Sequence, residues 1–555
     1  MLKEDSLILF FKVFSIKQIK HICGIAISVY HVYRHTKGIV KIMIQIFATI
    51  FESGGIGENI GVGRLKAYIE ENGEAVEVIY LDKNRSIESQ WDKVSKNCSI
   101  FGFSMYNTNL EYFIEIINKI KEQISKSIIV VGSKFVTAYY EEILRNYSNI
   151  DFAILGHGEK ALLDLIKYSR SESIWNTDIL SHDNIVSKHS LDGKQAAVLD
   201  IKELPWPNRS WIKNNDLTSA YICESHGCVG KCSFCTYSTS HGRWNGRSAL
   251  DIYQELVEIN NVCKISNFEI TGGSFEDPGI LGKQKIRDLC FLILENKKMF
   301  SFRYYLRADS FSDTKEDKEL LQLMRKSGFN VAQVGIESGN SEDLLLYNKR
   351  ATLKQNKDTL NLLNEMDIFA RFFGFIMFNP YTTKERLKLN YRFLCEFGAG
   401  LLSMFVNKLE IYNKTSICNQ VKKDDLLTCE GRFYDNGFTY KYRQSDIEEI
   451  DCFINKYFNG DDISKINKNT AGSCMFIYNF YKFVDSGLFY RNKMLEILND
   501  SANLLKEYFY VLYEEFDINK CENMFTKMIK AYAKNSDELF SLRNTLLKQY
   551  LRHYM

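Results

Sequence analysis

No apolar run in this sequence is long enough to cross a membrane as a helix. The best candidate, residues 6–33, is interrupted by Lys12, Lys17 and Lys20, whereas a spanning helix needs about 18 or more consecutive apolar residues. The stretch also lacks a small-residue cleavage site after a compact apolar region, which argues against a secretory signal. It fits an amphipathic surface helix or a translation start assigned too far upstream. We expect no membrane span, and we treat residues 1–42 as an uncertain N-terminal extension.

An excess of one charge is also missing. The chain has 71 Lys+Arg and 69 Asp+Glu, and the net charge of +2 argues against a broad nucleic-acid-binding face. We therefore expect no nucleic-acid partner. The hydrophobic fraction of 45% and the charged fraction of 25% are typical of a globular protein and exclude a mainly disordered, collagen-like or coiled-coil chain. A length of 555 residues exceeds one ordinary core and predicts two or three domains.

Cysteine is too dilute for a disulfide scaffold, with 14 in the whole chain. Most are scattered singly, and the simplest interpretation is that they are small buried core residues in a reducing cytosol. We therefore expect a cytoplasmic protein. Four cysteines crowd between Cys223 and Cys235 and need another explanation.

Residues 43–169 alternate short apolar runs with helical periods. This alternation predicts a parallel, doubly wound (Rossmann-like) sheet with helices on both faces. Ligands bind such sheets at the carboxyl ends of the strands, where three loops (residues 52–57, 104–109 and 156–159) are candidates, although their glycines can also be ordinary turn residues. The expected strands are Ile44–Thr49, Ala75–Leu81, Ile100–Ser104, Ile128–Val131 and Phe152–Leu155.

The alternation resumes over residues 217–407, after a polar linker at 170–216 that holds two of the four prolines. Six strand–helix units predict a partial (β/α)6 TIM-like barrel with functional groups at the carboxyl ends of its strands. Residues 408–555 are expected to be mostly helical, with Tyr and Phe stripes in the core. The expected barrel strands are Ser219–Cys223, Asn267–Thr271, Ser301–Arg307, Val331–Ile336, Phe372–Met377 and Leu401–Phe405.

The segment CESHGCVGKCSFCTYSTSHGRW follows the first of these strands. Within it Cys228, Cys232 and Cys235 form a C-x3-C-x2-C motif. A closed structural zinc site needs four ligands, and no second cysteine pair or His-x3-His follows. Cys223, His226 or His241 could still complete a zinc knuckle, so this alternative stays open.

Iron–sulfur clusters are held by cysteine thiolates. Three thiolates on a four-iron cluster leave one iron open, and an open metal position can bind a small chelating substrate. Gly227 and Gly230 suit a loop that wraps tightly around a cluster and donates backbone amides to its sulfurs. The motif therefore favours a 4Fe-4S cluster.

This loop, after the first strand of a six-unit partial barrel, resembles the radical S-adenosylmethionine (radical SAM) superfamily. The resemblance implies that Cys228, Cys232 and Cys235 ligate a 4Fe-4S cluster and that SAM chelates the open iron. It also implies reductive cleavage of SAM to a 5′-deoxyadenosyl radical. Phe234 matches the aromatic position that lies near the adenine.

Turns at the ends of the next strands match the same superfamily. In ITGGSFEDPG, Ser274 stands where the superfamily often has the Glu of a turn that holds the SAM amino group, so the resemblance leaves that role to the backbone carbonyls of Gly272 and Gly273. Arg307 in YYLRADS is expected to meet the SAM carboxylate or ribose.

The phrase VGIESGN resembles one that is frequent in a cobalamin-binding branch of the superfamily, and it implies that Glu337 and Ser338 bond the ribose hydroxyls. For Arg307 and Glu337 an ion pair at the barrel rim is the structural alternative.

The preceding doubly wound domain strengthens the resemblance to that branch. Three phrases, GFSMYNTN, VVGSKFVT and ILGHGEKALLDL, lie where the branch holds cobalamin, with His157 and Ser133 in place of the usual Glu and Gly. The Asp-x-His-x2-Gly motif that supplies a histidine ligand in other cobalamin proteins is absent. The implied cobalamin-binding residues are Ser104, Tyr106, Asn107, Gly132, Ser133, Gly156, Gly158 and Glu159.

The resemblance implies a radical SAM enzyme that methylates an unactivated carbon of a small-molecule or peptide substrate with the help of cobalamin. A flavodoxin or ferredoxin-type reductant is the implied partner. Two alternatives remain at this point. One is rearrangement, cyclisation or oxidation without methyl transfer, and the other is a non-catalytic metal- or cluster-binding protein.

Overall fold

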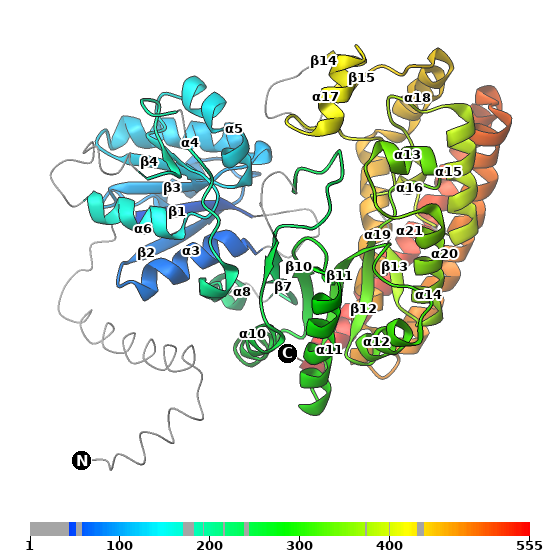
Figure 1. The fold of residues 1–555 in the computed structure, drawn as a ribbon, viewed down its shortest axis with the longest axis horizontal. Coiled ribbons are helices and arrows are strands. Elements are labelled where there is room, and N and C mark those ends of the chain that lie inside the picture. Colours follow the sequence, from blue (N-terminus) through cyan, green and yellow to red (C-terminus); the bar gives the residue numbers. More distant parts are fainter. Residues whose placement is uncertain are drawn as a thin grey trace. The chain divides into compact units, whose positions relative to one another are not determined.

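A computed structural model describes residues 44–50, 58–169, 182–191, 194–214, 217–237, 244–371, 374–398, 400–429 and 438–554 (Figure 1). The expectations for residues 1–42, for the loop at 52–57 and for His241 lie outside these residues. By contacts the chain divides into two compact units. The first unit is formed mainly by residues 61–197 with the strand before them, and the second mainly by residues 209–555.

The first unit is a doubly wound sheet, as predicted. Its strand order is β2-β1-β3-β4-β5-β6, and all neighbours are parallel except β6, which pairs antiparallel with β5. The order reverses beside β1, so the carboxyl ends of β1 and β3 lie at a topological switch point. The strands are β1 (Ile44–Thr49), β2 (Val76–Leu81), β3 (Ile100–Ser104), β4 (Ile128–Gly132), β5 (Phe152–Ile154) and β6 (Ile185–Val186).

Helices of the first unit cover this sheet. All six residues of β1 are buried, as expected of a central parallel strand covered on both faces. On α4 the buried residues Phe113, Ile116, Ile117 and Ile120 recur at helical spacing and form one apolar face. The helices are α3 (Ile60–Glu71), α4 (Leu110–Gln123), α5 (Lys134–Asn146) and α6 (Glu159–Tyr168).

The second unit is built on a parallel sheet of order β13-β12-β11-β10-β7. Its strands are β7 (Ser219–Cys223), β10 (Asn267–Thr271), β11 (Ser301–Arg307), β12 (Phe329–Gly335) and β13 (Phe369–Arg371). Its helices include α8 (Ser210–Asn214), α10 (Ala249–Cys263), α11 (Ile280–Glu295), α12 (Lys315–Lys326), α13 (Ser341–Leu346), α14 (Leu353–Glu365) and α15 (Lys384–Phe397). A short antiparallel pair, β8 (Ser225–His226) and β9 (Asn245–Gly246), follows β7.

The last two barrel strands differ from the prediction. β13 ends at Arg371, so the strand expected over 372–377 begins and ends earlier. The strand expected at Leu401–Phe405 is wrong, because this segment forms helix α16 (Ser403–Val406). Its apolar side chains pack against C-terminal helices, with the rings of Phe405 and Phe509 stacked 4.8 Å apart. A short apolar run does not distinguish a buried strand from a buried helix.

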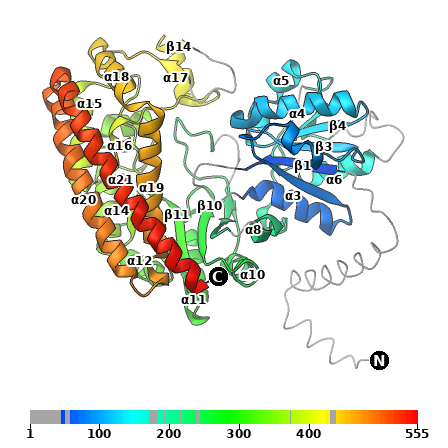
Figure 2. The same cartoon turned by 180° about the vertical axis from the view of Figure 1, so that it is seen from behind.

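The C-terminal region is helical, as predicted, and it shares one hydrophobic core with the sheet of the second unit. α19 packs along α21, and α21 along α20 (Figure 2). α19 also packs against β11, where Asn479 accepts a hydrogen bond from Ser301 Oγ at 3.3 Å and Met475 Sδ accepts one from Arg303 at 3.1 Å. These elements are α17 (Ser416–Lys423), β14 (Leu427–Cys429), β15 (Thr439–Tyr440), α18 (Ser445–Phe458), α19 (Asp461–Phe480), α20 (Gly487–Tyr510) and α21 (Ile518–Tyr554).

None of the helices in the described part of the chain is both long enough and apolar enough to cross a membrane.

Candidate functional site

The cysteine loop (residues 224–237) follows β7 directly, at the carboxyl edge of the parallel sheet. It carries Cys228, Cys232 and Cys235, which are all partly buried and lie within electrostatic reach of one another. Burial raises the pKa of Cys232 to about 11, and the neighbouring thiols act in the same direction. Such a thiol is a poor nucleophile at neutral pH by itself, whereas a metal centre holds it as the thiolate.

The first half of the cysteine loop packs against the turn after β10. A Cβ atom on Gly273 would lie 2.5 Å from the Gly227 carbonyl oxygen and 2.9 Å from Cys228 Cβ. One on Gly272 would lie 2.6 Å from Glu224 Oε1. Gly273 is therefore needed for the close backbone approach that places Cys228, and Gly272 leaves room for the Glu224 side chain.

Backbone amides of the same half of the loop are directed at polar partners. Gly230 N–H donates to Cys228 Sγ at 3.3 Å, and Val229 N–H donates to Asp277 Oδ2 at 3.4 Å. An amide that donates to a cysteine sulfur is the arrangement expected of a loop that holds a cluster. Ser274, in the turn after β10, is buried, and its carbonyl oxygen accepts from Asp277 N–H at 3.0 Å.

The second half of the loop is bound to the turn between α13 and α14. Ser233 donates from its N–H to the Tyr347 carbonyl at 2.9 Å and from its Oγ to the Leu346 carbonyl at 2.8 Å. Asn348 Nδ2 donates to the Lys231 carbonyl at 2.7 Å. These bonds fix the residues on both sides of Cys232. Sequence reasoning missed the role of this turn, because its partners are more than 100 residues away and no local motif marks it.

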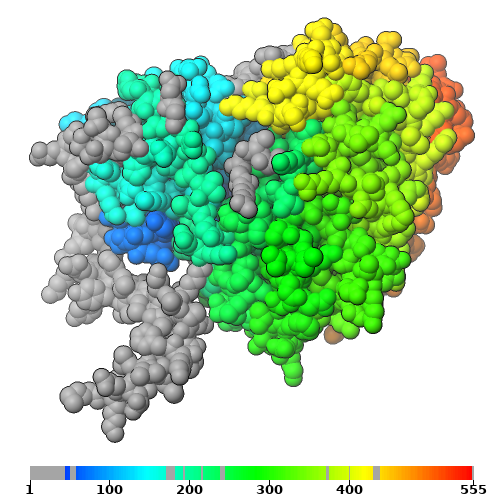
Figure 3. Space-filling view, viewed as in Figure 1, coloured from blue at the N-terminus to red at the C-terminus, as the bar shows by residue number. Residues whose placement is uncertain are grey.

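α17 provides a further support for the loop. Ile417 N–H and Ser416 Oγ donate to the Ser233 carbonyl at 3.0 and 3.2 Å. The ring of Phe234 meets that of Tyr347 edge to face, with centroids 5.5 Å apart. The segment that contains α17 is drawn in yellow at the surface of the second unit (Figure 3). Phe234 is thus held in a defined orientation beside Cys235.

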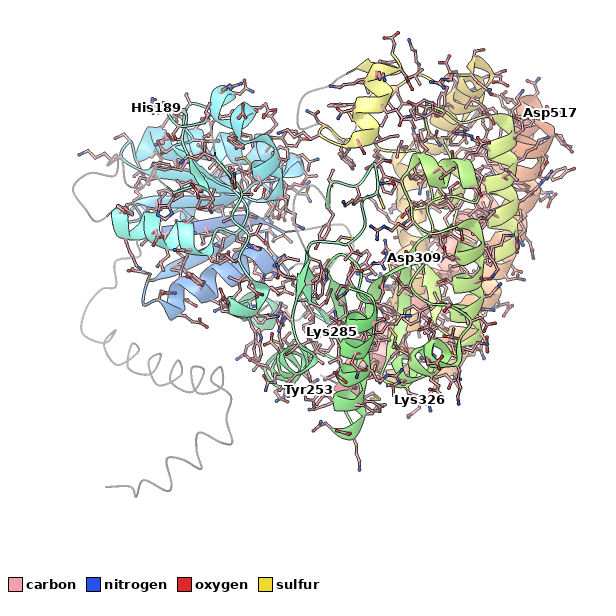
Figure 4. All side chains as sticks on the ribbon, in the orientation of Figure 1. His189, Tyr253, Lys285, Asp309, Lys326 and Asp517 are labelled. Atoms are coloured by element: carbon pink, nitrogen blue, oxygen red, sulfur yellow. The ribbon has the colours of Figure 1, made fainter. Side chains whose placement is uncertain are left out.

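Arg307, at the end of β11, is engaged with acidic side chains. Its Nε lies 2.9 Å from Asp309 Oδ1, and its Nη1 pairs with Asp277 (Asp309 is labelled in Figure 4). Its Nη1 also lies 3.5 Å from Glu276 Oε1. The ion-pair alternative for Arg307 is therefore present, and its contact with SAM stays a prediction.

Glu276 is a buried carboxyl group of this edge with a raised pKa. It is fully buried, and burial raises its pKa to about 7 against the opposing effect of Arg307. Ser310 Oγ donates to its Oε1 at 2.5 Å, while its Oε2 is buried without a hydrogen-bond partner. Sequence reasoning used the segment ITGGSFEDPG for Gly272, Gly273 and Ser274 and missed Glu276 and Asp277, although two adjacent acidic residues after a strand were a visible signal.

The two residues predicted to bind ribose lie in different environments. Glu337 has a φ of +62° and is partly buried, and its Oε1 lies 3.2 Å from Lys349 Nζ. Ser338 is fully buried, and its Oγ donates to Asn390 Oδ1 at 2.8 Å and to Asp343 Oδ2 at 3.2 Å. The ion-pair alternative for Glu337 is therefore present and its contact with ribose stays a prediction, whereas the Ser338 hydroxyl is used within the protein.

In the first unit the predicted cobalamin residues gather at the carboxyl ends of β3, β4 and β5. Ser104 ends β3, Gly132 ends β4 and Gly156 follows β5. Ser133 caps α5 by accepting from Val136 N–H at 3.1 Å. Tyr106, Asn107 and Gly158 lie in the turns that open the next helices.

The turn after β5 carries an unusual acidic group. Glu159 is 4% exposed, burial raises its pKa, and its Oε2 has no hydrogen-bond partner. Burial, together with Arg64, lowers the pKa of the neighbouring His157 to about 4, so His157 is neutral at neutral pH. A buried carboxylate oxygen that lacks a donor, on a ligand-binding edge of a doubly wound sheet, fits a polar cofactor with hydrogen-bond donors.

Within the part of the chain that the structure describes, no three His, Cys, Asp or Glu side chains converge on a point that would hold a single metal ion. A four-iron cluster is larger than one ion, so its ligands need not converge in this way. The three thiols, the donating loop amide and the two supporting turns fit such a cluster.

Two protein-family models match this chain, one in each of its two units. The profile of the B12 binding domain matches residues 48–166, and that of the radical SAM superfamily matches residues 224–394. The second match begins at the cysteine loop.

Solved structures share the fold. The cobalamin-dependent SAM radical enzyme OxsB, with aqua-cobalamin and SAM bound, has a TM-score of 0.66 and 19% identity over 94% of this chain and 80% of its own. The radical SAM methyltransferase TsrM from Kitasatospora setae has a TM-score of 0.54 and 15% identity over 71% of this chain and 77% of its own.

Curated relatives are similar over part of the chain. The 4′-phospho-dehydrooxetanocin synthase of Priestia megaterium is 26% identical over 64% of this chain and 51% of its own length. The anaerobic magnesium-protoporphyrin IX monomethyl ester cyclase of Cereibacter sphaeroides is 25% identical over 50% of this chain and 46% of its own length. The chain thus spans about half the length of these relatives.

The predicted cofactors, a 4Fe-4S cluster with SAM and cobalamin, are those of the two matched families. The fold, the cysteine loop and both profile matches agree: the chain contains a B12-binding domain over residues 48–166 and a radical SAM superfamily domain over residues 224–394.

Proposed function

We propose that this cobalamin-dependent radical SAM enzyme transfers a methyl group to an unactivated carbon of a small-molecule or peptide substrate. The observation that carries the proposal is the cysteine loop, held between two turns at the carboxyl edge of a parallel sheet, in a chain that also has a B12-binding domain. When bound, the cofactors supply one-electron reduction of SAM and a carrier for its methyl group. A flavodoxin or ferredoxin-type protein is the proposed electron donor.

Residues of the second unit would hold the cluster and SAM. Cys228, Cys232 and Cys235 are the proposed cluster ligands, kept in place by the turns after β10 and α13. Phe234, fixed against Tyr347, offers an apolar face for an adenine ring. These residues orient the bound SAM and exclude water from it.

Polar groups around this loop are the proposed contacts for the charged parts of SAM. The carbonyls after β10, at Gly272, Gly273 and Ser274, are acceptors suited to an ammonium group. Arg307 is a donor suited to a carboxylate, and Glu337 an acceptor suited to ribose hydroxyls. In the first unit, the loop ends that contain Ser104, Tyr106, Asn107, Gly132, Ser133, Gly156, Gly158 and Glu159 are proposed to hold cobalamin.

A second candidate is radical rearrangement, cyclisation or oxidation without methyl transfer. The names of two curated relatives, a cyclase and a synthase, favour it. TsrM, which is named as a methyltransferase, favours methyl transfer instead. The radical SAM profile match disfavours the remaining alternative, a non-catalytic metal-binding protein.

Anaerobic reconstitution with iron and sulfide tests the cluster assignment. We expect the wild-type protein to gain a broad visible absorption band and about four iron atoms per chain, and Cys228→Ala, Cys232→Ala and Cys235→Ala to lose them. Cys452→Ala is the matched control, because Cys452 is exposed on α18, outside the loop. An unchanged band in the three loop variants would refute the assignment.

Methyl-labelled SAM separates the two candidate reactions. The reconstituted enzyme is incubated with the label, dithionite and cobalamin in extract of the source cells. Label in a new small-molecule or peptide product supports methylation. Formation of 5′-deoxyadenosine with all label left in SAM and methionine contradicts methylation and favours the second candidate.

A further inference from the structure

A buried lysine lies beside the cysteine loop. Lys349 follows the turn between α13 and α14, and its side chain is 8% exposed. Its Nζ lies 3.2 Å from Glu337 Oε1, and a Cβ atom on Gly335 would lie 3.0 Å from both atoms. The Lys349–Glu337 pair therefore lies directly over the end of β12, at the edge that the loop occupies. Neither the mechanism above nor the sequence motifs use Lys349.

The backbone ties Lys349 to the loop. Its two predecessors, Tyr347 and Asn348, hold Ser233 and Lys231, which are the residues on either side of Cys232. The position of the lysine relative to Cys232 is thus set by short hydrogen bonds of 2.7–2.9 Å. A fixed cation is thus placed beside the segment that carries Cys232.

Charges around Lys349 come from several elements. Glu337 after β12, Cys232 on the loop and Asp309 after β11 all act on its ammonium group and favour the charged form, against burial. Among the charged side chains that act on Cys232, Lys349 is the strongest, ahead of Glu337.

Cys228 has different surroundings. The nearby charges are those of Asp277 and Arg307, which pair with each other and act on Cys228 in opposite directions. Each side of the loop thus faces an ion pair, but the stronger charge at Cys228 is the Asp277 carboxylate, whereas the stronger charge at Cys232 is the Lys349 ammonium.

We propose that the buried Lys349 ammonium, fixed beside the segment that carries Cys232, raises the reduction potential of the cluster. The inference rests on the proposed assignment of the three cysteines as cluster ligands. Reduction adds a negative charge to the site, and a buried ammonium nearby stabilises the reduced state more than the oxidised one. Removing the ammonium therefore makes the cluster harder to reduce.

An EPR-monitored redox titration of the reconstituted full-length protein, without SAM, tests the proposal. In Lys349→Met we expect the ratio of reduced to oxidised cluster, at the wild-type midpoint, to fall about tenfold, which is a shift of about 59 mV to lower potential for one electron. Lys349→Arg retains the charge and is expected to keep the wild-type midpoint. The double variant Glu337→Gln/Lys349→Met also removes the Glu337 carboxylate, which Lys349→Met leaves without its cation. We expect it to show a smaller shift of the midpoint potential in the same direction.

Lys285→Met is the matched control. Lys285 is a second buried lysine (9% exposed; labelled in Figure 4), and it pairs at 2.5 Å with Glu224, the first residue of the cysteine loop. Its removal strands a carboxylate in the same way but leaves the charges that act on Cys232 in place. We expect its midpoint to equal that of the wild type.

The outcomes are distinct. If Lys349→Met holds the full iron content and its midpoint potential equals that of the wild type, the inference is overturned. A wild-type midpoint potential combined with weaker SAM binding also overturns it and would assign the lysine to SAM binding. If Lys349→Met folds but holds no cluster, recovery of iron content in Lys349→Arg supports the proposal, and failure of Lys349→Arg overturns it. Failure of the wild-type protein itself to form a cluster refutes the proposed function instead.

Discussion

The close approach between the turn after β10 and the cysteine loop makes a sharp prediction. In Gly273→Ala the new Cβ would lie 2.5 Å from the Gly227 carbonyl oxygen and 2.9 Å from Cys228 Cβ. Ordinary contacts require roughly 3.5 Å, so the two segments must separate by about 1 Å. Both obstacles are backbone or the first side-chain atom, which cannot turn away by a change of rotamer. The displacement therefore falls on Cys228.

The cost of this displacement can be estimated. Overpacking of this kind costs about 1–3 kcal/mol of folding free energy, which a large unit tolerates. A shift of about 1 Å in a reacting group costs on the order of 100-fold in rate. We therefore expect Gly273→Ala to fold, to hold less iron than the wild type, and to form 5′-deoxyadenosine about 100-fold more slowly.

Gly472→Ala is the matched control for this substitution. Gly472 lies in α19, and a Cβ atom added to it would have no neighbouring atom within 4 Å outside its own helix. Replacement of an unhindered helical glycine stabilises a protein by roughly 0.5–1 kcal/mol. Thermal unfolding, iron content and 5′-deoxyadenosine formation are compared in the two variants. Wild-type iron content and rate in Gly273→Ala would refute the steric argument.

Two further predictions concern buried charges of the second unit. Arg209 is buried between Glu58 and Glu255, so Arg209→Met should cost about 3–5 kcal/mol and lower the thermal midpoint, whereas the exposed Arg392→Met should change it little. The pKa of Glu276 is raised from 4.5 to about 7 by folding. The contribution of its carboxyl group to folding stability is therefore fully present below pH 4.5 and is lost as the pH rises to about 7. In Glu276→Gln we expect the thermal unfolding midpoint to fall less steeply with pH over this range than in the wild type. An unchanged dependence on pH would contradict the raised pKa of Glu276.

Much of the fold could be predicted because its strands are long, buried and separated by helices. β1, β3, β7, β10 and β11 have the predicted bounds, since each apolar run is bounded by clear turn signals. The prediction failed where that contrast is missing. The run Leu401–Phe405 is apolar except for Ser403, and its second half lies in helix α16, because its environment is a core of helices, which local sequence does not record.

The candidate site divides in the same way. The three cysteines were found because their spacing along the chain is itself the signal. The groups that hold them were not, because a hydrogen bond such as that from Asn348 to Lys231 joins residues that are far apart in sequence. Asp277 and Lys349 have no motif of their own; only the fold brings them to Cys228 and Cys232. The cluster ligands of such a site can thus be found from their spacing in the sequence, whereas the charged groups around them are brought together only by the tertiary structure. Variants at Lys349 and Gly273 test that second, non-local part, and variants at the cysteines test the first.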